Sequence, residues 1–215
     1  MDIPANSRLV MIGDSITDTG RKRPIGEGRK QEDTGKGYVS LVAAMLDAWY
    51  PAQPVRVTNM GISGNTVRHL DERWQSDVLD LKPDWLSIMI GINDVWRQFD
   101  QPLNPDTHVL PDEYRSTLDR LLTTTRPTVQ QLVLMSPFFI ETNKQDAMRA
   151  RMDEYGAMVK ELADKHDCRF VDVQAAFDAV LEHQHACHLA ADRVHPGLSG
   201  HMVIARAFLA AVGHR

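Results

Sequence analysis

The chain has 215 residues, of which 43% are hydrophobic and 25% charged, and its formal net charge is −5. This composition is typical of a globular protein, and the length predicts a single domain over residues 1–215. Because acidic and basic residues are interspersed, the sequence excludes the basic footprint of a protein that binds nucleic acid or an anionic membrane. No apolar run approaches the length of a transmembrane helix, and no basic head followed by an apolar stretch indicates a signal peptide.

The two cysteines, Cys168 and Cys187, do not have the spacing of a metal site. Together with the lack of a signal-peptide pattern, they predict reduced thiols and a cytoplasmic location. His183, His185 and His188 lie next to Cys187 in the sequence. No second cluster completes a four-ligand zinc site, so a solvated helix face is the favoured interpretation and no metal is expected.

Short apolar runs alternate along the chain with amphipathic segments. The runs lie at residues 9–12, 55–60, 85–90, 132–135 and 170–173. Apolar residues three or four positions apart predict helices between them; these lie at residues 38–49, 67–79, 113–125, 144–166 and 198–212. Strands that alternate with helices are typical of βαβ units, so we predict an α/β fold with a parallel sheet and helices on both faces.

Two long segments interrupt this alternation. Residues 20–37 contain five glycines and follow the first run, and residues 95–111 contain three prolines and follow the third. Loops that follow parallel strands lie at the carboxyl edge of the sheet, and long loops in a compact domain are often functional. Surface excursions or subunit contacts are the alternative interpretation.

The first apolar run ends in Gly13-Asp14-Ser15, followed by polar residues that could open a helix. A serine hydroxyl in this position lies at the edge where open α/β sheets bind ligands. Serine is a poor nucleophile at neutral pH and needs an adjacent base, normally histidine. A simple helix N-cap is the alternative role for Asp14 or Ser15.

A candidate base lies near the C-terminus, in the segment DRVHP. Asp192 and His195 are three positions apart, so on one turn their side chains can meet. A catalytic histidine needs such a carboxylate to fix its tautomer and to stabilise the imidazolium. A turn aspartate beside a surface histidine would produce the same pattern.

Candidate oxyanion donors follow the second and third strands. Asn93 in GIND can aim its amide N–H at a developing oxyanion, and Gly64 in NMGISGNT can present its backbone N–H to the same oxygen. Asp94 could brace this loop. Asparagine, aspartate and glycine are also common turn residues, so tight turns are the alternative.

Together these segments resemble, in order, the sequence blocks of the SGNH hydrolases, also called the GDSL esterase family, over residues 8–201. The matching residues are Ser15 in GDSITD, Gly64 in NMGISGNT, Asn93 in GIND and His195 in DRVHP, with Asp192 at the position of the triad aspartate. Ile16 replaces the leucine of the family name. The resemblance implies a flavodoxin-like three-layer α/β/α sandwich with a five-stranded parallel sheet.

The resemblance also implies a mechanism. Ser15 is the expected nucleophile, His195 the base and Asp192 its partner. The N–H groups of Ser15 and Gly64 and the amide of Asn93 form the expected oxyanion hole. No metal or organic cofactor is expected.

The segments GISGNTVR and MIGINDVWRQ are most similar to small bacterial acetylxylan esterases. We therefore expect hydrolysis of acetyl esters on xylo-oligosaccharides, with Asp14, Trp96 and Arg97 as candidate substrate-binding residues. An indole face can stack on a sugar, although a tryptophan buried beside the sheet is the alternative. Residues 138–140 could line an acyl pocket or a subunit interface, and a homo-oligomer is expected.

Three other functions fit parts of the pattern. A thioesterase or lysophospholipase would use the same machinery on longer acyl chains. A flavin- or phosphate-binding protein would use the same sheet edge, although the sequence has no strong phosphate-binding loop. A non-catalytic carbohydrate-binding module would not need an intact triad.

Overall fold

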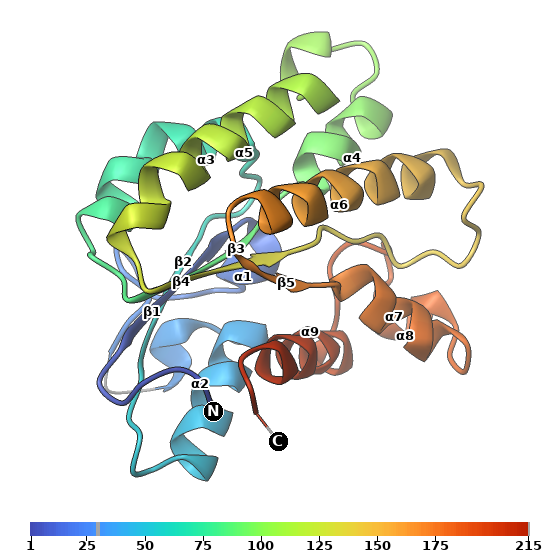
Figure 1. Cartoon of the computed structure of the whole chain (residues 1–215). Coiled ribbons are helices and arrows are strands. Elements are labelled where there is room, and N and C mark those ends of the chain that lie inside the picture. Colours follow the sequence, from blue (N-terminus) through green and yellow to red (C-terminus); the bar gives the residue numbers. More distant parts are fainter. Residues whose placement is uncertain (29–30, 215) are drawn as a thin grey trace.

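The computed structural model describes residues 1–28 and 31–214, and a sheet of five parallel strands forms its centre (Figure 1). The strands are β1 (Arg8–Gly13), β2 (Arg56–Gly61), β3 (Trp85–Met89), β4 (Gln131–Met135) and β5 (Arg169–Val171). They lie side by side in the order β2-β1-β3-β4-β5. This is the flavodoxin-like strand order. The five predicted strands and their parallel arrangement are therefore confirmed.

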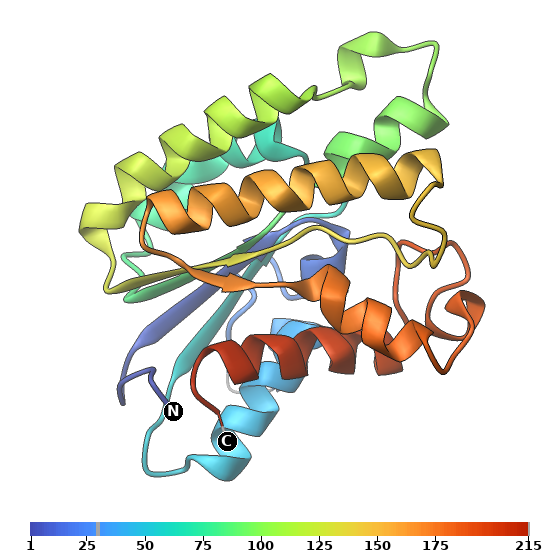
Figure 2. The same cartoon turned by 45° about the vertical axis from the view of Figure 1, so that its right-hand side comes forward.

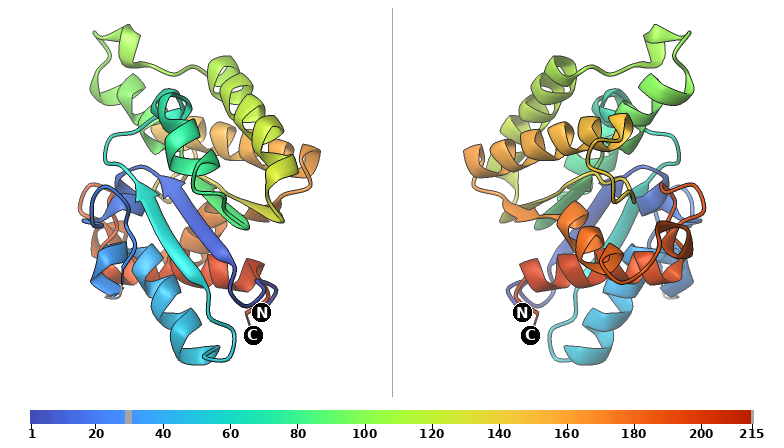
Figure 3. Two further views of the ribbon diagram at one scale, coloured as in Figure 1. Left: turned by 90° about the vertical axis from the view of Figure 1, so that its left-hand side faces the viewer. Right: turned by 90° about the vertical axis from the view of Figure 1, so that its right-hand side faces the viewer.

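Helices cover both faces of the sheet. Figures 1 and 2 show α3, α4, α5 and α6 on one face and α2, α7 and α9 on the other. The helices are α1 (Ser15–Asp18), α2 (Tyr38–Trp49), α3 (Val67–Trp74), α4 (Ile92–Asp100), α5 (Pro111–Thr125), α6 (Ala147–Lys165), α7 (Val173–Leu181), α8 (Ala186–Leu189) and α9 (Leu198–Ala211). Figure 3 shows β1 and β2 side by side between the two helix layers.

The apolar runs form strands because both faces of the sheet are covered. Leu9, Val10, Met11 and Ile12 are consecutive and all 0% exposed. A half-exposed strand would alternate apolar with polar residues, whereas a parallel strand between two helix layers buries every position. Each fully buried side chain of this kind contributes about 1.5–3 kcal/mol. None of the described helices combines the length and the apolar character needed to cross a bilayer.

The helix predicted over residues 67–79 has an unexpected second half. Helix α3 ends at Trp74 and continues as the π-helical segment η2 (Gln75–Leu79). In this segment the Asp80 N–H donates to the Gln75 carbonyl at 2.9 Å, which widens the turn. Such π-turns inside helices are often found at functional sites.

The long loop predicted over residues 95–111 is partly wrong, because α4 includes its first six residues. Ile92 and Val95 are buried, and their spacing is helical. The prediction missed this helix because it begins directly after β3, inside the segment interpreted as a loop. The remainder of the segment contains one turn of 3-10 helix, η3 (Pro105–Thr107).

The glycine-rich segment 20–37 protects the edge of the sheet. Gly26 forms an antiparallel bridge with Asn59 on the edge strand β2, with N–H to O distances of 3.1 and 2.9 Å. Arg21 Nε donates to the Gly61 carbonyl at 2.6 Å. The segment therefore occupies hydrogen-bonding groups that would otherwise be open to another chain. Residues 29–30 of this segment lie outside the described residues.

Residues 138–140 do not have either of their predicted roles. Phe138, Phe139 and Ile140 are at most 3% exposed, so they belong to the core of the chain itself. The ring of Phe138 lies 4.5 Å from that of Phe177. The apolar character of these residues therefore serves packing between β4 and α7, and not an acyl pocket or a subunit interface.

Candidate active site

Ser15 lies where β1 ends and α1 begins. A Cβ on Gly13 would collide with the Met89 carbonyl and the Thr17 hydroxyl, so only glycine fits at this strand end. Asp14 is the N-cap of α1, and its Oδ1 accepts the Ile16 N–H at 2.9 Å. Because Asp14 caps the helix, the hydroxyl of Ser15 is available for another partner.

That partner is His195. Ser15 Oγ lies 2.9 Å from His195 Nε2, and His195 Nδ1 lies 2.7 Å from Asp192 Oδ2. This is the hydrogen-bond pattern of a Ser-His-Asp triad. With the imidazole Nδ1–H donating to Asp192, the other nitrogen is left as an acceptor for the serine proton.

The loop that carries Asp192 and His195 is organised by the aspartate itself. Asp192 Oδ1 accepts the backbone N–H groups of Val194 and His195 at 2.9 and 2.8 Å. Partial burial raises the pKa of Asp192, but these bonds and the His195 ring outweigh it and hold the pKa below its ordinary value. The carboxylate is therefore ionised at neutral pH, as an orienting partner of histidine requires.

Arg193, which lies between Asp192 and His195, attaches this loop to the core. Arg193 forms an ion pair with Glu141 at 2.5 Å and lies over the ring of Phe139, 4.8 Å from its centroid. The Ile140 N–H donates to the Arg193 carbonyl at 2.9 Å. The buried residues 138–140 thus support the histidine loop from beneath.

The predicted oxyanion donors lie in the same cavity as Ser15 and His195. Gly64 has a φ of +81°, which L side chains rarely adopt, and its N–H has no acceptor within the described part of the chain. Asn93 Nδ2 donates to the Asn65 carbonyl at 3.0 Å, so one amide hydrogen orients the group and the other is free. The Ser15 N–H opens α1, where helical N–H groups have no intrahelical acceptor.

The cavity is a cleft of about 640 Å³ between α3 and α4. It is lined by Ser15, Ser63, Gly64, Thr66, Arg68, His69, Glu72, Asn93, Trp96, Arg97, Gln101, Asp106, Thr107 and His195. Of the two long segments that the sequence placed at the carboxyl edge, no described residue of 20–37 lines the cavity, whereas residues of 95–111 do. The rim comes instead from α3, α4 and η3.

Trp96 and Arg97 lie where the sequence predicted them, on the wall of this cavity. The Trp96 ring lies 5.7 Å from the His195 ring, centroid to centroid, at 60°. The Arg97 guanidinium lies 4.6 Å from the centroid of Trp96 and forms an ion pair with Asp100 at 2.8 Å. The indole is partly exposed and lines the cavity beside the histidine, so the alternative of a fully buried tryptophan is wrong.

Asp14, the third candidate substrate-binding residue, is the N-cap of α1 instead, which was its alternative role. It is 1% exposed and does not line the cavity. Burial raises its pKa to about 7, and the same cause raises the pKa of Asp94 to about 7. Asp94 Oδ1 accepts the Val67 N–H at 2.9 Å, so Asp94 braces the start of α3 from α4. Asp14 and Asp94 thus support the loops that carry Ser15 and Asn93.

Sequence reasoning missed His69 and Glu72, which line the cavity from one face of α3. His69 Nδ1 accepts the Thr66 N–H at 3.1 Å, so the proton of the neutral ring is on Nε2. The Glu72 side chain is exposed and forms no hydrogen bond or ion pair with any other described residue. Their spacing, three positions apart in the helix after GISGNT, was the available signal.

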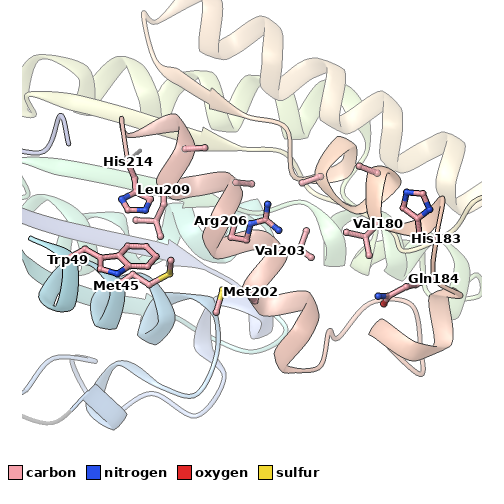
Figure 4. A pocket seen from close by; sticks show the side chains of 14 residues that line it. Met45, Trp49, Val180, His183, Gln184, Met202, Val203, Arg206, Leu209 and His214 are labelled. Atoms are coloured by element: carbon pink, nitrogen blue, oxygen red, sulfur yellow. The ribbon is translucent and has the colours of Figure 1, made fainter.

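A second cavity of about 760 Å³ lies elsewhere, between α2, α7 and α9. Figure 4 shows its mostly apolar lining, which includes Trp49, Met202 and Val203. It contains neither the serine nor any residue of the cleft around it. Chemistry, and not size, therefore identifies the candidate site.

Comparisons with known proteins agree with this geometry. Residues 11–203 match the model of the GDSL-like lipase/acylhydrolase family. An acetylxylan esterase from Geobacillus stearothermophilus is 54% identical over 213 residues, which are 99% of this chain and 97% of that protein. A structure of an acetylxylan esterase from that organism superimposes with a TM-score of 0.98 at 53% identity, covering 100% of this chain and 98% of that one.

Further structures extend the comparison. An alpha/beta hydrolase enzyme from the metagenome of Lake Arreo, Spain, is 56% identical, with a TM-score of 0.97 and coverage of 100% of this chain and 98% of that one. Three structures of the Geobacillus enzyme are catalytic mutants, in which a serine, a histidine and an aspartate are each replaced by alanine. The chain therefore belongs to the GDSL-like lipase/acylhydrolase family.

Proposed function

We propose that this protein is a serine esterase that removes acetyl groups from acetylated xylo-oligosaccharides. Ser15 is the nucleophile, His195 the general base and Asp192 the residue that orients it. The observation that carries the proposal is the continuous set of bonds from Asp192 through His195 to Ser15, because Ser15 and His195 line a cleft that Asn93 also lines. The catalytic mutants of the relative, at the same three residue types, support these roles.

In the first half of the reaction the acetyl group moves to the enzyme. Ser15 Oγ attacks the ester carbonyl while His195 Nε2 takes its proton. The carbonyl oxygen becomes an oxyanion, which accepts hydrogen bonds from the free N–H groups near it: Asn93 Nδ2 and the backbone of Gly64 and Ser15. The C–O bond to the alcohol then breaks, and His195 gives the proton to the departing oxygen.

The second half repeats these steps with water. His195 takes a proton from water as the water oxygen attacks the acetyl-enzyme carbonyl. When the tetrahedral intermediate collapses, the bond to Ser15 breaks and the proton returns to Ser15 Oγ, leaving acetate. Side chains of His195 and Asp192 are about half exposed, so water can reach the imidazole. Every step uses only side chains, backbone N–H groups and water.

The cleft favours a hydroxyl-rich alcohol. A volume of about 640 Å³ leaves room well beyond an acetyl group. The partly exposed Trp96 offers an indole face for a sugar ring, and α3 offers a donor and an acceptor, His69 Nε2–H and the Glu72 carboxylate. This combination of a ring platform with polar groups suits a sugar. The name of the Geobacillus relative, acetylxylan esterase, supports xylo-oligosaccharides as the class.

A thioesterase or lysophospholipase acting on long acyl chains remains the second candidate, but the cleft does not favour it. Trp96 is the only large apolar side chain among the described residues that line the cleft. A long acyl chain needs an extended apolar channel, because each buried methylene contributes about 0.8 kcal/mol. The apolar cavity of Figure 4 shares no lining residue with the cleft.

The test is kcat/KM on acetyl, butyryl and octanoyl esters of one alcohol, followed by acetate release from acetylated xylose oligomers. We expect acetyl to be the best acyl group and acetate to be released from the oligomers. Faster hydrolysis of the octanoyl ester, or no acetate from any acetylated sugar, would move the assignment to the long-chain alternative.

Three further expectations stay predictions. We infer one domain over residues 1–215, which the single hydrophobic cluster spanning both helix layers supports. A homo-oligomer is expected, and light scattering that gives the 24.2 kDa monomer mass at micromolar concentration would reject it. A cytoplasmic location, which the two free cysteines favour, also stays a prediction.

A further inference from the structure

Arg73 lies one position before the end of α3 and does not line the cleft, yet its guanidinium contacts several segments that build the site. Its side chain is only 13% exposed. A buried guanidinium is stable only when its N–H groups find acceptors, so the choice of acceptors shows what the residue holds together.

The first two acceptors are strand ends. Arg73 Nη2 donates to the Gly13 carbonyl at 3.1 Å and Nη1 donates to the Met60 carbonyl at 2.7 Å. Gly13 is the last residue of β1, two positions before Ser15, and Met60 lies near the end of β2. One guanidinium therefore fixes the strand that carries the nucleophile relative to the strand that leads into the Gly64 loop.

The third acceptor lies in the Gly64 loop itself. Arg73 Nε donates to the side-chain oxygen of Asn65 at 2.8 Å. The backbone carbonyl of the same Asn65 accepts Asn93 Nδ2 at 3.0 Å. Asn65 therefore links Arg73 to Asn93: its side chain is held by Arg73, and its backbone carbonyl orients the Asn93 amide.

Asp77 completes the set. It lies in the π-helical segment η2, and its Oδ2 is 2.7 Å from Arg73 Nη1. The carboxylate neutralises the buried charge and fixes the plane of the guanidinium. This gives the unexpected π-turn a role, since Asp77 is one of its residues.

We propose that Arg73 is a positioning residue for the oxyanion hole, acting through Asn65 on the Asn93 amide and the adjacent Gly64 N–H. Its planar fork reaches the two strand ends and Asn65 at once, a geometry that the point charge of lysine does not reproduce. The oxyanion hole works because its donors are aimed before the charge develops. Loosening Asn65 would therefore reduce stabilisation of the transition state more than binding of the substrate. This inference rests on the proposed esterase function.

The test compares Arg73→Lys with Arg120→Lys. Arg120 is a matched control, because it forms a two-bond ion pair with Asp71 on the outside of α3 and contacts no part of the site. We expect Arg73→Lys to lower kcat on an acetyl ester by at least about tenfold with less than about a twofold change in KM, by analogy with the cost of losing one oxyanion donor. Arg120→Lys should leave both constants unchanged.

A second readout separates positioning from loss of fold. The Ser15 oxygen bonds to the carbonyl carbon of a trifluoromethyl ketone and its proton passes to His195 Nε2, so the ketone oxygen becomes an anion in the oxyanion hole. Its inhibition constant should rise in Arg73→Lys by about the same factor as kcat falls. A variant that is merely less stable would show a lower melting temperature, with unchanged kcat and inhibition constant per folded molecule.

A double-mutant cycle tests the route through Asn93. In an Asn93→Ala background, Arg73→Lys should have a much smaller effect on kcat than in the wild type, since residues that act as a unit are not additive. Full multiplication of the two losses would overturn the proposal. If Arg73→Lys does not fold, Asn65→Ala is the second variant. It removes the hydrogen bond between Asn65 and Arg73 while Arg73 keeps its strand contacts, and it should show the same fall in kcat.

Different results would overturn the proposed function and the role of Arg73. Acetyl esterase activity that survives in Ser15→Ala would overturn the proposed function. A wild type that depends on Ser15, together with Arg73→Lys and Asn65→Ala variants of normal kcat, would overturn only the role of Arg73.

Discussion

Ser15 and His195 are 180 positions apart in the sequence, yet Ser15 Oγ and His195 Nε2 lie 2.9 Å from each other. The sheet order explains this proximity. Strand β1 is near the centre of the sheet, and the loop before α9 returns the chain to the carboxyl edge, where β1 ends. The nucleophile and base thus come from opposite ends of the chain and meet where open α/β sheets place their ligands.

The role of Asp192 is best tested with asparagine. Asp192→Asn keeps an oxygen that can accept the Val194 and His195 N–H groups, so the loop should keep its shape. Its amide would donate to His195 Nδ1 and force the proton onto Nε2, the wrong tautomer for a base. We expect kcat to fall on the order of a thousandfold or more. Steady-state kinetics of Asp192→Asn with a near-normal rate would contradict the orienting role.

Asn93→Ala removes one oxyanion donor and leaves the triad intact. We expect kcat to fall roughly a hundred- to a thousandfold, with a smaller change in KM, because the amide bonds an oxygen that is fully charged only in the transition state. Initial rates over a range of substrate concentrations separate the two constants. A variant with normal kcat and raised KM would place Asn93 in ground-state binding instead.

Glu72→Gln tests the sugar side of the cleft. Glutamine keeps the shape of the side chain and removes its charge, which weakens a hydrogen bond to a sugar hydroxyl. We expect kcat/KM on an acetylated xylo-oligosaccharide to fall roughly tenfold, or about 1.4 kcal/mol. Hydrolysis of phenyl acetate, which has no sugar, should not change.

Glu182→Gln is the matched control for this prediction, because Glu182 is an exposed glutamate outside the cleft. Equal losses on phenyl acetate and on the oligosaccharide would show that Glu72 acts on the fold and not on the sugar.

The buried His201 should lower the free energy of unfolding in acid. It is 5% exposed, and its Nδ1 accepts the Tyr38 N–H at 3.2 Å. Burial, with a smaller contribution from His195, lowers its pKa from 6.5 to about 4. Between these values the unfolded chain binds a proton that the folded chain does not, so the free energy of unfolding falls as the pH drops from about 6.5 to about 4. The full effect of this group is about 3 kcal/mol.

Asp14 and Asp94 have the opposite effect, because they raise the free energy of unfolding as the pH drops. The measurement must therefore isolate the contribution of His201. Their raised pKa values, about 7, mean that the folded chain binds protons at these sites before the unfolded chain does. His201→Gln keeps an acceptor for Tyr38 but does not titrate. Urea unfolding between pH 7 and 4 should show wild type losing stability relative to this variant. Parallel curves for the two proteins would contradict the prediction.

The sequence predicted the sheet and the triad because both leave local signals. The strands are apolar runs, since covered parallel strands bury every residue, and Ser15, Gly64, Asn93 and His195 lie in short segments at strand or helix ends. Because each segment follows a strand or precedes a helix, the sequence alone indicates that they lie at one edge of the sheet.

Other features depend on tertiary packing that no local pattern carries. The role of Arg73 follows from acceptors on β1, β2 and the Gly64 loop, which only the folded chain brings together. Asp14 was a candidate substrate-binding residue with a helix N-cap as its alternative role, and the structure shows the N-cap. Residues 138–140 follow a strand and were predicted to line an acyl pocket or a subunit interface, whereas Phe138 and Phe139 pack against α7 and all three are buried.

The central claim is that Ser15 attacks an acetyl ester carried by a sugar. The measurement that tests it most directly is acetate release from acetylated xylo-oligosaccharides by wild type and by Ser15→Ala, each shown to be folded by its melting temperature. We predict steady release of acetate by the wild type, and a rate at least about a thousandfold lower in Ser15→Ala. Acetate release by Ser15→Ala at the wild-type rate would contradict the account, because the nucleophile would then be another group.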